Sequence, residues 1–117
     1  MKYMILIHQG STPMPGTPEW EALSADEQQR VYADYGAVNA TPGFTPGERM
    51  AAPDTATTVR VADGRTLTTD GPFVETKEAL GGYAFFEAED LDAAIELAAR
   101  IPAARMGGAV EVRPITG

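Results

Sequence analysis

The sequence predicts an α+β fold of the ferredoxin-like type, a split βαβ arrangement (βαββαβ) with an inserted β-hairpin. Three observations predict it. Short apolar segments have the length and composition of strands, two segments have helical caps and spacing, and an Asp-Gly pair at 63–64 separates two Thr-rich runs. The chain has 117 residues, 44% of them hydrophobic, so we expect one domain, residues 1–117, with an ordinary core.

The first half of the chain predicts a strand, two helical segments and a short strand. Residues 3–8 are apolar at most positions, which is typical of a strand covered on both faces. A Thr-Pro pair at 17–18 favours a short helical turn. Ser24 and Glu27 form a capping box, and the helix that begins there ends before the next Pro-Gly pair. The apolar stripe of this helix is Val31, Tyr35 and Val38. A short strand is expected at 48–51.

The second half predicts a hairpin, a strand, a helix and a final strand. Residues 57–61 and 65–69 are the two strands of the hairpin, because Asp-Gly tolerates the positive φ values of a tight turn. A buried strand is expected at 82–86. Asp90 caps a helix that Pro102 stops, and an alternating strand follows. The expected apolar stripe of that helix is Leu91, Ala94, Ile95 and Ala98, and the last strand is 110–113.

The predicted sheet has one face without a cover. Two helices cover one face, whereas the other carries Tyr, Phe and Met side chains that no third helix is available to cover. An apolar face of that size seldom stays in water. We therefore predict a homodimer in which the same faces of two chains pack together.

Composition excludes several classes of function. The chain has no cysteine and a single histidine, which excludes disulfides and zinc sites built from Cys or several His, so no metal is expected. It has no cofactor motif of the phosphate-loop type, and no cofactor is predicted. The formal charge of −8 disfavours nucleic acid and anionic membranes. No apolar run approaches the ~20 residues of a membrane span, and we expect a cytoplasmic location.

The segment 70–78, Asp-Gly-Pro-Phe-Val-Glu-Thr-Lys-Glu, is the most informative part of the chain. It resembles the signature of the YCII-related, or DGPF, family of small bacterial proteins. The surrounding sequence agrees in several places, namely the opening Met-Lys-Tyr, Thr57-Thr58-Val59-Arg60, Asp63-Gly64, Leu80-Gly81-Gly82-Tyr83, Ile101-Pro102-Ala103-Ala104 and residues 110–114. The resemblance spans nearly the whole chain, with 10–43 as its poorest part.

The resemblance implies a ferredoxin-like domain that dimerises into an α/β barrel. A histidine–aspartate pair has been suggested as a catalytic site in YCII-like relatives. Asp70 matches the aspartate of the DGPF motif, whereas His8 stands where other members more often have tyrosine. Some relatives are encoded beside sigma factors of the extracytoplasmic-function type, which implies a regulatory setting for part of the family.

Asp70 and His8 are the candidate catalytic residues. Asp70 is a candidate general base or ligand acceptor, and equally a residue that caps its own turn before Gly-Pro. His8 is the sole histidine and a candidate proton partner, although a hydrogen-bonded filler at a strand end is the commoner role. A functional His8 must reach Asp70 or a shared ligand.

Four further residues are candidate ligand-binding groups. In an extended chain Phe73, Glu75 and Lys77 share one side, so they could line one wall of a site, with Lys77 as an electrostatic clamp. The commoner alternative is a solvated charged loop. Arg60 could add positive charge, as could Arg113, or both could be surface arginines that pair with Glu111 or other acidic residues.

Two functions follow from these candidates. The first is a small enzyme or enzyme-like binding protein with a small-molecule pocket between the sheet and the Asp70 loop, using Asp70 for acid–base chemistry. The second is a non-enzymatic regulatory or interaction module, with a possible link to sigma-factor signalling, in which the loop is a rigid clasp.

Overall fold

The computed structural model describes residues 1–72 and 80–116. It is an α+β structure with a four-stranded sheet and a separate two-stranded one. In chain order the elements are β1 (Lys2–His8), α1 (Pro18–Glu21), α2 (Ala25–Asn39), β2 (Phe44–Pro46), η1 (Pro53–Thr55), β3 (Thr57–Ala62), β4 (Arg65–Asp70), β5 (Leu80–Glu87), α3 (Leu91–Ala99), η2 (Pro102–Ala104) and β6 (Ala109–Pro114). No helix in the described ranges is long and apolar enough to cross a membrane.

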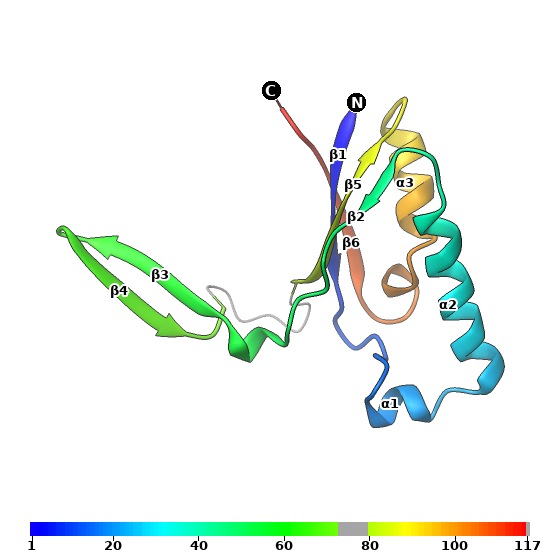
Figure 1. Ribbon diagram of the computed structural model, residues 1–117, viewed down its shortest axis with the longest axis horizontal. Helices are drawn as coiled ribbons and strands as arrows, with labels where there is room; N and C mark the ends of the chain where they lie inside the picture. The colour runs from blue at the N-terminus through cyan, green and yellow to red at the C-terminus, as the bar shows by residue number, and fades with distance from the viewer. Residues whose placement is uncertain (73–79, 117) are drawn as a thin grey trace.

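The main sheet has the strand order β2-β5-β1-β6, and every neighbouring pair is antiparallel. The central strand β1 pairs with β5 and β6, so that Met4 lies opposite Phe85 on one side and Arg113 on the other. Helices α2 and α3 lie on the same side of this sheet (Figure 1). This arrangement is compatible with the ferredoxin-like fold predicted from the sequence.

The core lies between the sheet and the two longer helices. Alternate residues of β1 and β5 point toward the helices, as the period of two in a strand requires. The largest fully buried side chains are Tyr3, Ile5, Leu97, Ile101, Val38 and Pro102.

Both predicted helix caps are confirmed. Ser24 Oγ accepts a hydrogen bond from the backbone N–H of Glu27 at 3.1 Å. Asp90 Oδ1 accepts one from the N–H of Ala93 at 2.9 Å. Each cap satisfies a donor that the first turn of a helix would otherwise leave unpaired.

Two element predictions are wrong in detail. The short strand is at Phe44–Pro46 and not at 48–51; proline is tolerated there because β2 is an edge strand with one side unpaired. Helix α3 is rotated from the predicted stripe, with Leu91 and Ile95 about half exposed, at 49% and 50%, and Leu97 buried. Ala94 and Ala98, the other two residues of the predicted stripe, are buried as predicted.

The predicted hairpin is confirmed, and it stands apart from the rest of the molecule. Among the strands of the described residues, β3 and β4 pair with each other alone, from Thr57 opposite Asp70 to Ala62 opposite Arg65. Asp63 and Gly64 form the tip with φ values of 51° and 74°, as a type I′ turn needs. The hairpin reaches out on the side of the sheet opposite the helices (Figure 1).

Candidate functional site

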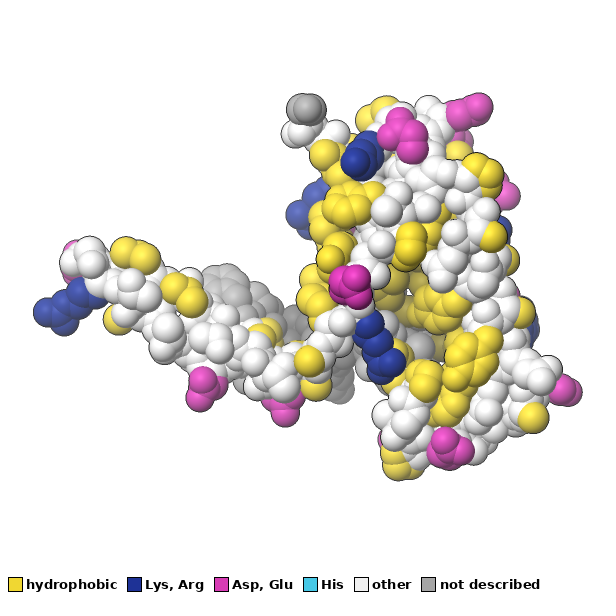
Figure 2. All heavy atoms as spheres, viewed as in Figure 1, with side chains coloured by type: hydrophobic (Ala, Val, Ile, Leu, Met, Phe, Trp, Pro, Cys, Tyr) yellow, Lys and Arg dark blue, Asp and Glu magenta, His cyan; other side chains and the backbone are white. Residues whose placement is uncertain are grey.

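A cavity of about 270 Å³ lies between α2 and the helix-facing side of the sheet. We call it the α2 cavity. Figure 2 shows hydrophobic side chains around a hollow in this part of the body. Its apolar walls include Ile7, Met14, Val38, Phe44, Ala84 and Ile101. Its polar side chains are Gln9, Tyr35, Asn39, Glu48 and Arg49. An apolar space with few polar groups is the usual form of a small-molecule site.

Tyr35 and Arg49 form an electrostatically coupled pair at this cavity. Burial raises the pKa of the Tyr35 hydroxyl, and the positive charge of Arg49 partly opposes that rise. The hydroxyl therefore keeps its proton at neutral pH and can donate a hydrogen bond. Arg49 is exposed and also lines the cavity, where its guanidinium can donate hydrogen bonds.

Gln9 supplies an acceptor without a partner. Its Oε1 is buried and accepts no hydrogen bond within the described structure, and such a group costs about 1–3 kcal/mol if it stays unpaired. Gly81 makes room for this side chain, because a Cβ at position 81 would lie 2.3 Å from Gln9 Cγ. The glycine at position 81 thus leaves the space on β5 that the Gln9 side chain occupies.

These cavity residues were not among the candidates predicted from the sequence. Tyr35 was assigned to the core stripe of α2, and Gln9 and Arg49 lie in loops with no motif of their own. The available signal was the Gly-Gly pair at 81–82, which allows a close approach of another chain segment. Sequence spacing alone does not bring residues 9, 35 and 49 together.

Asp70 lies at the base of the hairpin, exposed, as the last residue of β4. The N–H donors that a cap by Asp70 would use begin at residue 73, outside the described residues, so the predicted turn cap stays a prediction. The base of the hairpin is held by hydrogen bonds from the Gly71 N–H to the Ala56 carbonyl and from Thr58 Oγ1 to the Gly71 carbonyl, each at 2.7 Å. Asp70 does not line the α2 cavity, and its catalytic role stays a prediction.

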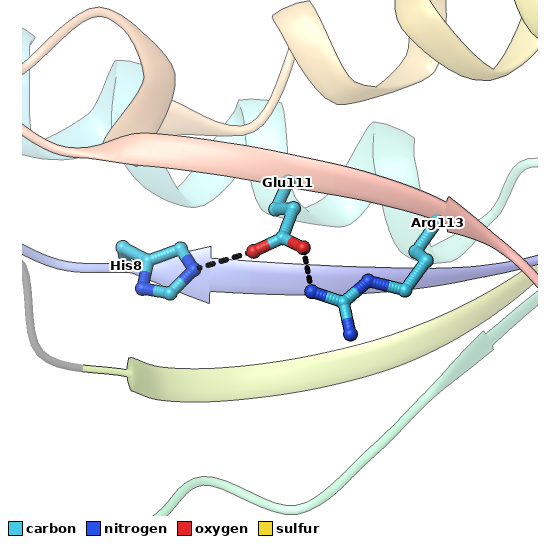
Figure 3. Close-up of polar contacts among 3 residues, drawn as sticks. All are labelled: His8, Glu111 and Arg113. Carbon is cyan, nitrogen blue, oxygen red and sulfur yellow. Dashed lines mark hydrogen bonds and ion pairs between the residues drawn. The ribbon is translucent and has the colours of Figure 1, made fainter. Parts of the chain in front are cut away.

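His8 meets a carboxylate other than Asp70. Its Nε2 lies 3.3 Å from Glu111 Oε1, and the other carboxylate oxygen of Glu111 accepts a hydrogen bond from Arg113 (Figure 3). These bonds, that of Arg113 first and that of His8 second, lower the pKa of Glu111. The alternative in which Arg113 pairs with Glu111 is therefore confirmed.

The remaining candidates lie on or beyond the hairpin. Arg60 is an exposed residue of β3. Phe73, Glu75 and Lys77 lie outside the described residues. In the ranges 1–72 and 80–116, no group of His, Asp and Glu side chains is arranged to hold a metal ion.

The face of the main sheet opposite the helices is apolar at its centre. We call it the open face. Met4 and Leu6 of β1 and Tyr83 and Phe85 of β5 lie on it and are half-buried. Lys2 Nζ lies 5.2 Å from the centroid of the Phe85 ring, and the His8–Glu111–Arg113 cluster lies on the same face, away from the helices (Figure 3). None of the described helices covers this face.

Comparison with known proteins agrees with the resemblance seen at 70–78. The chain matches the YCII-related domain over residues 1–117. It is 35% identical over 99 residues to the uncharacterized protein R00369 of Rhizobium meliloti (strain 1021), an alignment that covers 80% of each chain.

Proposed function

The chain belongs to the YCII-related domain family, and from this premise we propose that it is a homodimeric domain that binds a small molecule in the α2 cavity. The family match specifies no reaction, so the proposal depends on the geometry of the site. The observation that carries it is the apolar cavity whose lining includes the polar side chains of Gln9, Tyr35 and Arg49.

The size of the cavity limits the ligand. At about 270 Å³ it lies near the lower end of the roughly 300–1,000 Å³ range of ligand sites. A metabolite with a single ring or a short branched chain is of the right size, whereas a dinucleotide is too large. The walls formed by Val38, Phe44 and Ile101 favour an apolar body for such a ligand.

The polar groups define the class of ligand further. Arg49 and the protonated hydroxyl of Tyr35 are both donors, and together they suit a carboxylate. Gln9 Oε1 needs a donor, such as a hydroxyl or amine N–H on the ligand. We therefore propose a small hydroxy or amino acid with an apolar body as the ligand class.

Binding is favoured over catalysis at this cavity. Its described lining contains no histidine, and its one carboxylate is that of Glu48, an exposed residue. General acid–base catalysis needs a titrating group within hydrogen-bond reach of the reacting atoms. Acid–base chemistry by Asp70 would require this residue to reach a ligand elsewhere.

The open face supports the homodimer. Its apolar centre is formed by Met4, Leu6, Tyr83 and Phe85, and contiguous apolar surface of this kind marks an interaction site. An isologous pairing would cover the same patch on both chains. The barrel implied by the family resemblance would form by this pairing.

A thermal-shift series tests the ligand proposal. Small aromatic and aliphatic hydroxy acids are compared with their neutral amides and with matching amines, on the wild type and on Arg49→Gln. We expect acids to raise the melting temperature of the wild type and to lose about tenfold or more in affinity in Arg49→Gln, because a charge-assisted hydrogen bond contributes about 1.5–3 kcal/mol.

Arg30→Gln is the matched control, because Arg30 is an exposed arginine of α2 that does not line the cavity. It should bind acids like the wild type. A native mass spectrum of the purified protein adds a test for a co-purified small molecule. If no probe shifts the melting temperature and the protein carries nothing, the proposal is wrong; if only amines bind, Glu48 and not Arg49 selects the ligand.

A further inference from the structure

The β3–β4 hairpin, which we call the arm, packs little against the other elements in the described ranges 1–72 and 80–116. Each of its strands packs mainly against the other, and every residue of both strands is exposed except Thr58. Three large apolar side chains are in water, with exposed fractions of 59% for Val59, 70% for Val61 and 48% for Leu67. Figure 2 shows hydrophobic side chains along the arm.

An arm of this kind is not stable by itself. An isolated two-stranded hairpin is marginal in water, and a third strand or a packed face is needed for independent stability. No strand of the described part of the chain pairs with the outer edge of β3 or of β4, and unpaired edges are sites for pairing with another chain. The radius of gyration is 16.2 Å, against about 13 Å for a compact domain of ~100 residues, so the arm reaches well beyond the body.

The direction in which the arm extends indicates where a body that packs against it must lie. It extends on the side of the sheet opposite α2 and α3, which is the side of the open face (Figure 1). A body that packs on the open face therefore lies beside the arm. If that body is a second copy related by a twofold axis, its own arm lies beside the first chain in the same way.

The two faces of the arm differ in chemistry. From the register of β3 and β4, Val59 and Val61 share one face with Thr66 and Thr68. Leu67 lies on the opposite face, beside Arg60 and Arg65. Val59 and Val61 have only threonines opposite them, which suits a buried contact, whereas burying Leu67 would also bury two guanidinium groups, and an unpaired buried charge costs free energy.

We propose that the arm is a clasp for a second copy of this chain, and that the Val59–Val61 face packs against the body of the partner. This inference depends on the homodimer proposed above and adds a second contact region to the open face. It also gives a reason for the long connection between β2 and β5, which a short loop could otherwise join.

The test begins with the dissociation constant of the dimer, measured by analytical ultracentrifugation. The double variant V59T/V61T keeps β-branched side chains and so keeps the strand propensity, but it removes four methyl groups from a symmetric dimer. We expect about a 100-fold weaker dimer. Arg65→Gln, on the opposite face, is the matched control and should change the constant by less than about twofold.

A second measurement needs no change to the valines. The chain has no cysteine, so Ala62→Cys near the tip of the arm can carry a single spin label. Labelled chains are mixed with unlabelled, ¹⁵N-enriched wild type, and paramagnetic broadening is observed in the enriched copy. Broadening of amides in residues 1–46 or 80–114 of that copy is the expected result, since only an arm from the other chain can cause it.

The outcomes separate the two proposals. A full-length chain that stays monomeric at high concentration overturns both the dimer and the clasp. A dimer that V59T/V61T leaves unchanged, with no intermolecular broadening, overturns the clasp alone. If Arg65→Gln weakens the dimer as much as the valine variant does, the assignment of the contact to the Val59–Val61 face is wrong. Ligand binding in the α2 cavity is measured separately and depends on neither result.

Discussion

Glu111 binds two basic side chains on the open face, and these contacts determine how its contribution to the stability of the fold depends on pH. Arg113 and His8 both bind its carboxylate, and the pKa of Glu111 in the folded chain lies below its ordinary value of 4.5. A depressed folded-state pKa stabilises the fold above the unfolded-state pKa, and that contribution is lost as the pH falls through the lowered value. Protonation of Glu111 in acid therefore removes the stabilising contribution of its contacts with Arg113 and His8.

The variant Glu111→Gln tests this linkage. We expect its melting temperature to lie below that of the wild type near neutral pH, and the difference to close as the pH falls below the ordinary value of 4.5. Melting curves of both proteins across this pH range are the measurement. Glu96→Gln, at an exposed position of α3, is the control; a difference that grows in acid would contradict the assignment.

At the same scale, the candidate site shows what a sequence can and cannot place. The sequence identified His8 and Asp70 as chemically interesting, and it identified Glu111 as a partner for arginine. It did not pair His8 with Glu111, because β1 and β6 lie at opposite ends of the chain and only the sheet order brings residues 8 and 111 together. The α2 cavity was missed for the same reason.

Among the elements, those with strong local chemistry were predicted best. The caps at Ser24 and Asp90 and the Asp63-Gly64 turn are determined by a few neighbouring residues, and the structure confirms each. The rotation of α3 was not predictable from its own pattern. Leu91, Ala94, Ile95 and Ala98 fit a helical stripe, but packing against the sheet instead buries Leu97 with the two small alanines.

A pair of truncations in α3 checks this rotation. Leu97→Ala should cost about 2–5 kcal/mol in the free energy of unfolding, because it leaves a cavity at a residue that is 1% exposed. Ile95→Ala, at a half-exposed position of the same helix, should change it by about 0.5 kcal/mol or less. Urea denaturation measures both. Equal losses, or a larger loss at Ile95, would support the stripe predicted from the sequence.

For the whole molecule, the open face and the arm point to the same missing partner. The body buries the centre of its helix-facing side, with Tyr3, Ile5 and Leu97 at 2% exposure or less. The opposite side leaves Leu6 and Phe85 only half-buried, and the arm extends on this same side of the sheet (Figure 1). In a monomer the helices cover one face of the sheet, whereas the apolar side chains of the open face and of the arm stay in contact with water.

A charge placed at the centre of the open face tests this conclusion. Leu6 lies opposite Glu111 in the register of β1 and β6, so Leu6→Glu puts a second carboxylate beside an existing one. In a dimer packed through this face, both new charges would lose water and repel each other across the twofold axis. We expect the dissociation constant, measured by analytical ultracentrifugation, to rise by about 100-fold or more. Leu91→Glu introduces the same charge at an exposed leucine of α3, on the helix side, and should leave the dimer unchanged. If Leu6→Glu dimerises as tightly as the wild type while circular dichroism shows a native fold, the open face is not the interface.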